Sequence, residues 1–329
     1  MHPATRQVPI GQDVVMQTPS RLALFGASFL MLLAACGSTS NDSAASTVAA
    51  TAAPDTTAFD TTASSTASTV APATAAPASS ASGAESSPAT DLADGPVTYI
   101  ALGDSLTASE GDENYQGYVG LIGEAIGEAR GVDNVSVANF GASGWDSTMM
   151  VDGQDGAPGQ LGQAVTEAQN ALANGSAVLA TVLIGSNDMW YLYEYGPPEG
   201  TPAANEDAAI ETYRSNLNRT VTELIDAGAV VVIGLPDDQS LRPTVRDIDR
   251  VRDFLPDVTE EEVQQMAAVS VRLGEVTREI ADAHGVRTVD TNAPFWADPA
   301  KMADDGIHPN AAGYADFAEL WLAVVRGLL

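Results

Sequence analysis

The amino-acid sequence predicts an α/β protein built as a three-layer sandwich, in which a five-stranded parallel sheet lies between two layers of helices. Two observations lead to this prediction. Over residues 96–329, short apolar runs alternate with longer amphipathic segments, a pattern typical of strands and helices around a parallel sheet. These 234 residues are also enough for a single domain with a sizeable core.

The first half of this region predicts three strands and two helices. Val97–Leu102 is a short apolar run typical of a strand, and Tyr118–Ala129 is an amphipathic segment typical of a helix. The same pair of patterns follows as a strand at Val135–Phe140 and a helix at Gly162–Ala173. Ala177–Ile184 is strongly apolar and rich in β-branched residues, so it predicts the third strand.

The second half continues the alternation. We expect a helix around Ala208–Ala227, a strand at Ala229–Gly234 and a long helix across Glu260–His284. Val286–Asp290 predicts the last strand, and Ala311–Leu328 predicts the closing helix. The crossovers between parallel strands should be right-handed. Ligands of such sheets bind beyond the carboxyl ends of the strands, so we expect the chemistry of this protein just after each strand.

Residues 1–35 have the pattern of a signal peptide and not of a folded segment. Arg21 precedes an apolar run, Leu22–Leu33, that is too short to span a membrane. The run ends in Leu33-Ala34-Ala35-Cys36, which resembles the cleavage site of bacterial lipoproteins and predicts a lipid anchor on Cys36. The alternative is an ordinary secretory peptide with an incidental cysteine. Translation from Met16 would give a leader of more typical length.

Residues 36–95 predict a disordered linker. In the 59 residues that follow Cys36, 18 are Ala, 12 are Ser and 11 are Thr, and Phe59 is the one aromatic residue. Such a segment cannot bury enough apolar surface to offset the entropy lost on ordering. We therefore expect a flexible stalk between a membrane anchor and the domain at 96–329, on the outer face of a bacterial membrane.

The composition excludes several classes of function. The whole chain has a formal net charge of −30, and residues 96–329 carry 37 acidic against 12 basic residues. A nucleic-acid partner would need clustered Lys and Arg. Cys36 is the single cysteine, which excludes an internal disulfide framework and any metal site made of several cysteines.

Three segments that follow predicted strands contain candidate catalytic residues. Ser105 lies in a Gly-Asp-Ser-Leu-Thr turn after the first strand, and Gly144 lies in a Gly-rich segment after the second. Asn187 follows the third strand directly. A serine can attack a carbonyl, while a glycine N–H and an asparagine amide can donate to the resulting oxyanion. Each segment taken alone is also compatible with a plain turn.

A fourth segment supplies a candidate general base. Asp305 and His308 stand three residues apart just before the closing helix, a spacing that lets the carboxylate accept a hydrogen bond from the imidazole ring. A surface loop with an incidental histidine is the alternative. The other two histidines are weaker candidates, because His2 lies in the leader and His284 ends a predicted helix, where a cation suits the dipole.

Taken together and in this order, the four segments resemble the GDSL family of lipases and esterases, also called the SGNH hydrolases. The resemblance spans essentially all of residues 96–329, and it fits Gly144 better than Gly141 to the second motif. It implies a flavodoxin-like strand order. It also implies that Ser105 is the nucleophile, that His308 is the base oriented by Asp305, and that the oxyanion hole is formed by Ser105, Gly144 and Asn187. No metal or organic cofactor is needed for this chemistry.

This resemblance implies a serine esterase acting on lipid or small acyl esters. A carbohydrate deacetylase or O-acyltransferase is the alternative, and a non-catalytic binding lipoprotein is a third possibility. The long connection from Met189 to Asn205, with Trp190, Tyr191, Tyr193 and Tyr195, is expected to be a loop that either walls the substrate pocket or packs on the surface.

A second long connection, from Leu235 to Val258, contains Arg242, Arg246, Arg250 and Arg252. Such a cluster could meet an anionic substrate. Pairing of these arginines with the neighbouring aspartates Asp237, Asp238, Asp247, Asp249 and Asp253 is the simpler interpretation.

Overall fold

A computed structural model describes residues 91–194, 202–256 and 258–329 of the chain. The predicted leader, Cys36 and nearly all of the predicted linker lie outside these residues, as does Tyr195. Within the described ranges, no helix combines the length and the apolar content needed to cross a membrane.

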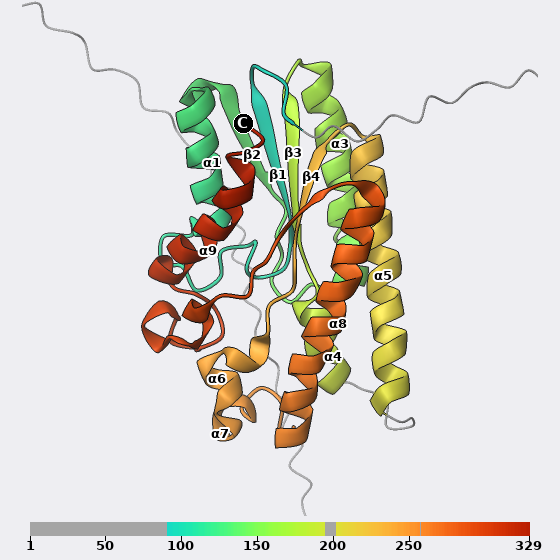
Figure 1. Ribbon diagram of the computed structural model, residues 1–329, viewed down its shortest axis with the longest axis vertical. Coiled ribbons are helices and arrows are strands. Elements are labelled where there is room, and N and C mark those ends of the chain that lie inside the picture. Colours follow the sequence, from blue (N-terminus) through green and yellow to red (C-terminus); the bar gives the residue numbers. More distant parts are fainter. Residues whose placement is uncertain (1–90, 195–201, 257) are drawn as a thin grey trace, which may run out of the picture. The chain divides into compact units, whose positions relative to one another are not determined.

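The centre of the fold is one parallel sheet of five strands, shown in Figure 1. The strands are β1 (Val97–Gly103), β2 (Val135–Asn139), β3 (Ala177–Leu183), β4 (Val230–Gly234) and β5 (Arg287–Val289). Their order across the sheet is β2-β1-β3-β4-β5, the flavodoxin-like order. The predicted fold class and strand order are confirmed, and no strand boundary differs from the prediction by more than one residue.

Helices cover both faces of the sheet, and its three central strands β1, β3 and β4 are buried on both sides. On β1, Tyr99 and Ala101 join one apolar cluster, whereas Ile100 and Leu102 join the other, as the alternation of side chains along a strand requires. The first cluster lies under α1 (Gly117–Arg130) and α9 (Ala311–Val325). The second lies under α3 (Gln160–Ala173), α5 (Pro202–Asp226) and α8 (Glu260–His284) (Figure 1).

Short helices occupy the connections, several of them beyond the carboxyl end of the sheet (Figure 1). They are η1 (Val132–Asn134), α2 (Ser147–Asp152), α4 (Ser186–Glu194), η2 (Gln239–Leu241), α6 (Pro243–Arg246), α7 (Ile248–Val251), η3 (Pro294–Ala297) and η4 (Pro299–Lys301). The sequence predicted none of these, because helices of one or two turns show too little periodicity to be recognised.

The prediction of a loop across Met189–Asn205 was wrong at both ends of that segment, because helices occupy them. Its first part belongs to α4, where Met189 is buried in the core and Trp190 and Tyr193 pack against the same cluster. Its last part belongs to α5, which begins at Pro202, and proline suits the first turn of a helix. Apolar packing of Met189, Trp190 and Tyr193 favours the helix at Ser186–Glu194, although its first residues are common in turns.

The ends of the domain are tied to its core. Residues 91–95, which the sequence assigned to the linker, pack on the domain: Leu92 is buried, and its N–H donates to the carbonyl of Leu328. The helix α8 ends where it was predicted to end, with Gly285 in the left-handed conformation at φ 65°. His284 pairs with Asn218 of α5 (2.9 Å), in keeping with its predicted structural role.

Candidate active site

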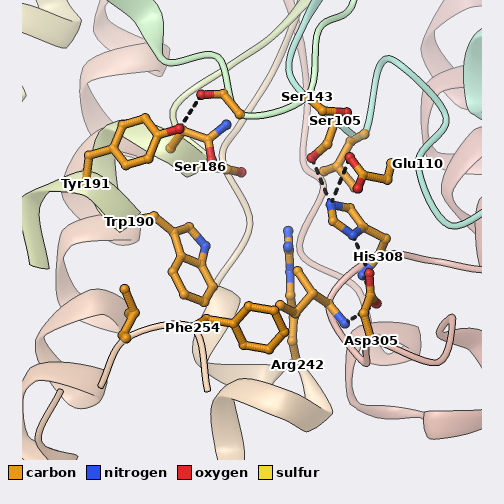
Figure 2. Close-up of a pocket in the computed structure, with 15 residues that line it drawn as sticks. Ser105, Glu110, Ser143, Ser186, Trp190, Tyr191, Arg242, Phe254, Asp305 and His308 are labelled. Carbon is orange, nitrogen blue, oxygen red and sulfur yellow. Dashed lines mark hydrogen bonds and ion pairs between the residues drawn. The ribbon is translucent and has the colours of Figure 1, made fainter. Parts of the chain in front are cut away.

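A pocket of about 500 Å³ lies at the carboxyl end of the sheet, and Figure 2 shows the side chains around it. Ser105, Gly144, Asn187, Asp305 and His308 all line this pocket. The structure therefore brings together, from four separate segments, every residue that the sequence placed in the catalytic set.

Tight backbone geometry holds Ser105 just beyond β1. Gly103 ends the strand at a φ of 156°, and a Cβ atom there would lie 2.2 Å from the carbonyl oxygen of Leu183, so only glycine fits. The side-chain amide of Gln160 both accepts from the N–H and donates to the carbonyl of Gly103, each at 2.8 Å. The strand end that carries Ser105 is thus clamped to the start of α3.

Asp104 is a buried carboxyl directly beside Ser105 that the sequence did not single out. Its Oδ1 accepts from the N–H of Leu106 (3.0 Å) and so shapes the turn after β1. Its Oδ2 is buried without a hydrogen-bond partner among the described residues. Burial raises the pKa of Asp104 to about 6, although the bond from Leu106 and the nearby Arg242 act in the opposite direction.

A chain of hydrogen bonds joins Asp305, His308 and Ser105. The Nδ1 of His308 lies 2.7 Å from Oδ2 of Asp305, and its Nε2 lies 2.9 Å from Oγ of Ser105 (Figure 2). The backbone N–H groups of Ile307 and His308 also donate to Asp305, at 2.8 and 3.0 Å. With Asp305 as acceptor at Nδ1, Nε2 is free to take the proton of Ser105.

Asp305 remains a carboxylate down to low pH. Burial alone would raise its pKa, but the hydrogen bond from His308 and those from the two backbone N–H groups outweigh burial and lower the pKa to about 2. An ionised Asp305 can therefore stabilise the imidazolium form of His308 over the whole neutral range.

The connection from Leu235 to Val258, which contains the four arginines, forms hydrogen bonds to the loop that carries Asp305. Arg250 and the hydroxyl of Thr244 donate to the backbone carbonyl of Asp305. Arg242 is buried, pairs with both carboxylate oxygens of Asp237 (2.9 Å) and stacks on Trp296. The predicted pairing of these arginines with neighbouring aspartates is confirmed for Arg242, whereas Arg250 and Arg252 bond to backbone carbonyls instead.

The segment after β2 presents Gly144 to the pocket. Gly144 has a φ of 79°, and its carbonyl accepts from the hydroxyl of Tyr191 (2.6 Å). Gly141 does not line the pocket, and its N–H donates to the side chain of Asn139 (2.9 Å). Of the two glycines, Gly144 is therefore the one that lines the pocket.

Asn187 reaches the pocket from the first turn of α4. One N–H of its amide donates to the carbonyl of Trp145 (2.9 Å), which fixes the plane of the amide and leaves the second N–H for another acceptor. Trp145 directly follows Gly144, so this bond also ties α4 to the glycine segment.

Asp188 is a second acidic residue that sequence reasoning missed. It accepts from both the N–H and the hydroxyl of Ser147, and Asn216 of α5 donates to the same hydroxyl. Burial raises the pKa of Asp188 to about 7, against the effect of the hydrogen bonds from Ser147. The cluster joins α2, α4 and α5 behind Asn187, and its members are too far apart in the sequence to suggest a contact.

The remaining lining separates into an acidic side and an aromatic side. Glu110 lies beside His308, with its Oε2 3.9 Å from Nε2 of the imidazole. Trp190, Tyr191 and Phe254 lie across the pocket from it (Figure 2). Tyr193, grouped with these aromatics in the sequence, instead bonds to Glu206 (3.0 Å).

No metal site is apparent in the part of the chain that the structure describes: no three His, Cys, Asp or Glu side chains are grouped so that they could hold an ion.

Comparison with known families gives one extended match. The family model described as the GDSL-like Lipase/Acylhydrolase family matches residues 101–315, a range that contains every residue of the pocket discussed above. A comparison with curated proteins gave no match.

Several solved structures are similar to this chain. One is LAE5, an α/β hydrolase enzyme from the metagenome of Lake Arreo, Spain, with 20% identity and a TM-score of 0.48 over 73% of this chain and 100% of that chain. Another is Axe2, an acetylxylan esterase from Geobacillus stearothermophilus, with 20% identity and a TM-score of 0.47. The match covers 71% of this chain and 96% of that chain. A third, the acetyl xylan esterase AlAXEase, has 16% identity and a TM-score of 0.45 over 69% and 99%.

Proposed function

Because this chain belongs to the GDSL-like lipase/acylhydrolase family, we propose that it hydrolyses carboxylic esters through a covalent acyl-enzyme on Ser105. Family membership makes it a serine hydrolase of ester bonds. The observation that supports Ser105 as the nucleophile is the hydrogen-bonded chain from Asp305 through His308 to its hydroxyl, with distances of 2.7 and 2.9 Å.

The proposed reaction has two halves. In the first, Oγ of Ser105 attacks the ester carbonyl while Nε2 of His308 takes its proton, and the tetrahedral intermediate collapses when His308 returns that proton to the leaving alcohol. In the second, His308 takes a proton from water, the resulting hydroxide attacks the acyl-enzyme, and the carboxylic acid leaves as Ser105 regains its proton. Asp305 stays ionised and holds the ring in the required tautomer.

We propose that the oxyanion of each intermediate accepts hydrogen bonds from the backbone N–H groups of Ser105 and Gly144 and from the side chain of Asn187. All three residues line the pocket. Neither backbone N–H has an acceptor among the described residues, so both are available to a substrate. One such donor contributes roughly 3 kcal/mol to lowering the barrier.

Labelling with a fluorophosphonate tests the nucleophile directly. We expect the purified protein to be labelled on Ser105 and to release free acid from p-nitrophenyl acetate. Ser105→Ala should lose both properties, whereas Ser215→Ala, which removes an exposed hydroxyl on α5, should keep them. Turnover by Ser105→Ala at the rate of the unchanged protein would overturn the mechanism, and an unlabelled, inactive protein would favour a non-catalytic binding role.

The aromatic side of the pocket favours a second candidate, a carbohydrate deacetylase or O-acyltransferase. Trp190, Tyr191 and Phe254 offer flat apolar surfaces of the kind on which a sugar ring can lie. Acetylated sugars would then be better substrates than simple alkyl acetates. A hydrolase would release free acetate from them, whereas an acyltransferase would transfer the acyl group to an added sugar.

We further propose that the protein is exported and anchored to the outer face of a bacterial membrane through a lipid on Cys36. The support lies in the sequence alone, in the apolar run that ends in Leu33-Ala34-Ala35-Cys36. Metabolic labelling with a fatty-acid analogue tests this proposal. Label should appear on the unchanged protein and be absent from Cys36→Ser, and an unlabelled but secreted protein would favour an ordinary signal peptide.

A further inference from the structure

Glu110 is held against the reacting groups by its own backbone. Its N–H donates to the carbonyl of Ser105 (2.9 Å), and its carbonyl accepts from the hydroxyl of Tyr314 (2.7 Å). Gly111, which follows, has a φ of 87°, and a Cβ atom there would lie 2.7 Å from Cβ of His308. This close approach fixes Glu110 beside His308, where its side chain is 45% exposed and lines the pocket (Figure 2).

No free positive charge in the described lining offsets this carboxylate. Arg242 is the one Lys or Arg that lines the pocket. Its side chain is 3% exposed, and it is already paired with Asp237. The domain around the pocket carries 37 acidic against 12 basic residues, so the wider field is negative as well.

The position of Glu110 relative to His308 indicates which part of a substrate it would meet. His308 must deliver its proton from Nε2 to the oxygen of the leaving alcohol, so that oxygen lies within hydrogen-bond reach of Nε2. The carboxylate of Glu110 lies 3.9 Å from the same nitrogen. We therefore expect the alcohol portion of a bound ester to lie beside Glu110.

From this arrangement, and on the basis of the proposed ester hydrolysis, we propose that Glu110 selects esters whose alcohol portion carries an ammonium group about two carbons from the ester oxygen. A charge at that distance comes within a few ångströms of the carboxylate. An anionic group at the same place would be repelled, so esters of acidic alcohols should be poor substrates. Because Glu110 is partly solvated, we expect a preference of about three- to ten-fold rather than an absolute requirement.

A matched pair of esters isolates the charge. Acetylcholine and 3,3-dimethylbutyl acetate have the same shape, and a carbon atom replaces the charged nitrogen in the second. We expect kcat/KM to be about three- to ten-fold higher for acetylcholine at low salt, and the ratio to fall as salt screens the charge. An effect of a variant on His308 itself changes kcat/KM for both esters equally, so it cancels in the ratio of the two values.

Two variants separate a local effect from the field of the whole domain. Glu110→Gln should bring the ratio close to one. Glu113→Gln removes the same charge from an exposed residue that lines a different cavity, and it should leave the ratio unchanged. A ratio near one in the unchanged protein, or an equal loss in both variants, would overturn the role of Glu110.

The test also separates this inference from the proposed function. The protein could hydrolyse p-nitrophenyl acetate but neither alkyl ester. In that case the two alcohols, choline and 3,3-dimethylbutanol, are compared as competitive inhibitors of p-nitrophenyl acetate hydrolysis. Choline should then bind about three- to ten-fold more tightly, and equal inhibition would overturn the inference. If p-nitrophenyl acetate is not hydrolysed either, the proposed ester hydrolysis itself fails.

Discussion

The two sides of the pocket are built in different ways. On the triad side, each functional group is fixed by more than one bond: Asp305 accepts three hydrogen bonds, and the strand end before Ser105 is clamped twice by Gln160. On the aromatic side, the hydroxyl of Tyr191 donates to the carbonyl of Gly144, but Phe254 is 50% exposed and lies in the turn after α7, where its N–H donates to the carbonyl of Val251. We therefore expect the rate of the chemical step to depend on the preorganised polar groups, and substrate choice to depend more on exposed residues such as Phe254.

The triad side should show the largest effects, and Asp305→Asn is the sharpest way to break it. An amide cannot stabilise the imidazolium form of His308, so we expect kcat to fall about a thousand-fold or more. The pKa of Asp305 is about 2, below the usual value for an aspartate. The carboxylate therefore stabilises the folded site fully at any pH above that usual value, and this stabilisation is lost only as the pH falls toward 2. The activity of Asp305→Asn should therefore not recover at any pH from about 4 to 9.

The neighbouring Asp304→Asn is the matched control, because Asp304 is exposed and the same charge is removed. It should keep the pH–rate profile of the unchanged protein. Activity of Asp305→Asn within a few-fold of that of the unchanged protein would mean that Asp305 does not orient His308.

Asn187→Ala should give an intermediate effect, because it removes one donor from the oxyanion hole and leaves the other two. We expect kcat to fall about a hundred-fold with little change in KM. The exposed Asn170→Ala on α3 should leave both constants unchanged. A rise in KM at constant kcat would assign Asn187 to substrate binding and place it with the aromatic side.

Phe254→Ala should give the smallest effect and sharpen the role of the aromatic side. We expect kcat/KM to fall about three- to ten-fold for bulky esters and to change little for acetyl esters, because the lost contact is with distant parts of the substrate. Rates on a series of p-nitrophenyl esters of increasing chain length measure this. Val271→Ala, an exposed apolar residue on α8, is the control, and an equal loss on every ester would contradict a role in selectivity.

Much of the fold could be predicted from the sequence because its elements are long or strongly periodic. β1, β3 and β4 are buried on both faces, so they are recognisable as apolar runs. The helix α8 carries a capping box at Thr259 and Glu262, and its boundaries were predicted correctly. The short helix α4 was missed, because its helical state depends on packing of Met189 and Trp190 rather than on a local signal.

The residues of the candidate site also separate into those that the sequence could identify and those that it could not. Ser105, His308 and Asp305 could be named because each stands at a strand end or before a helix, in a segment with recognisable chemistry. Asp188 could not be named, because its partners Ser147 and Asn216 come from other helices. Glu110 could not be named either, since an acidic residue in an acidic chain is distinguished only by its 3.9 Å distance from His308.

The sequence by itself determined the fold class and the residue types gathered at the pocket, because periodicity and turn chemistry are local properties of the chain. The tertiary structure alone decided which acidic residue stands beside His308 and which of the four arginines is buried. Several contacts that build the pocket join residues far apart in the chain, such as Asn187 with Trp145 (42 positions) and His308 with Ser105 (203 positions). A parallel sheet brings such residues to one edge only after it has folded.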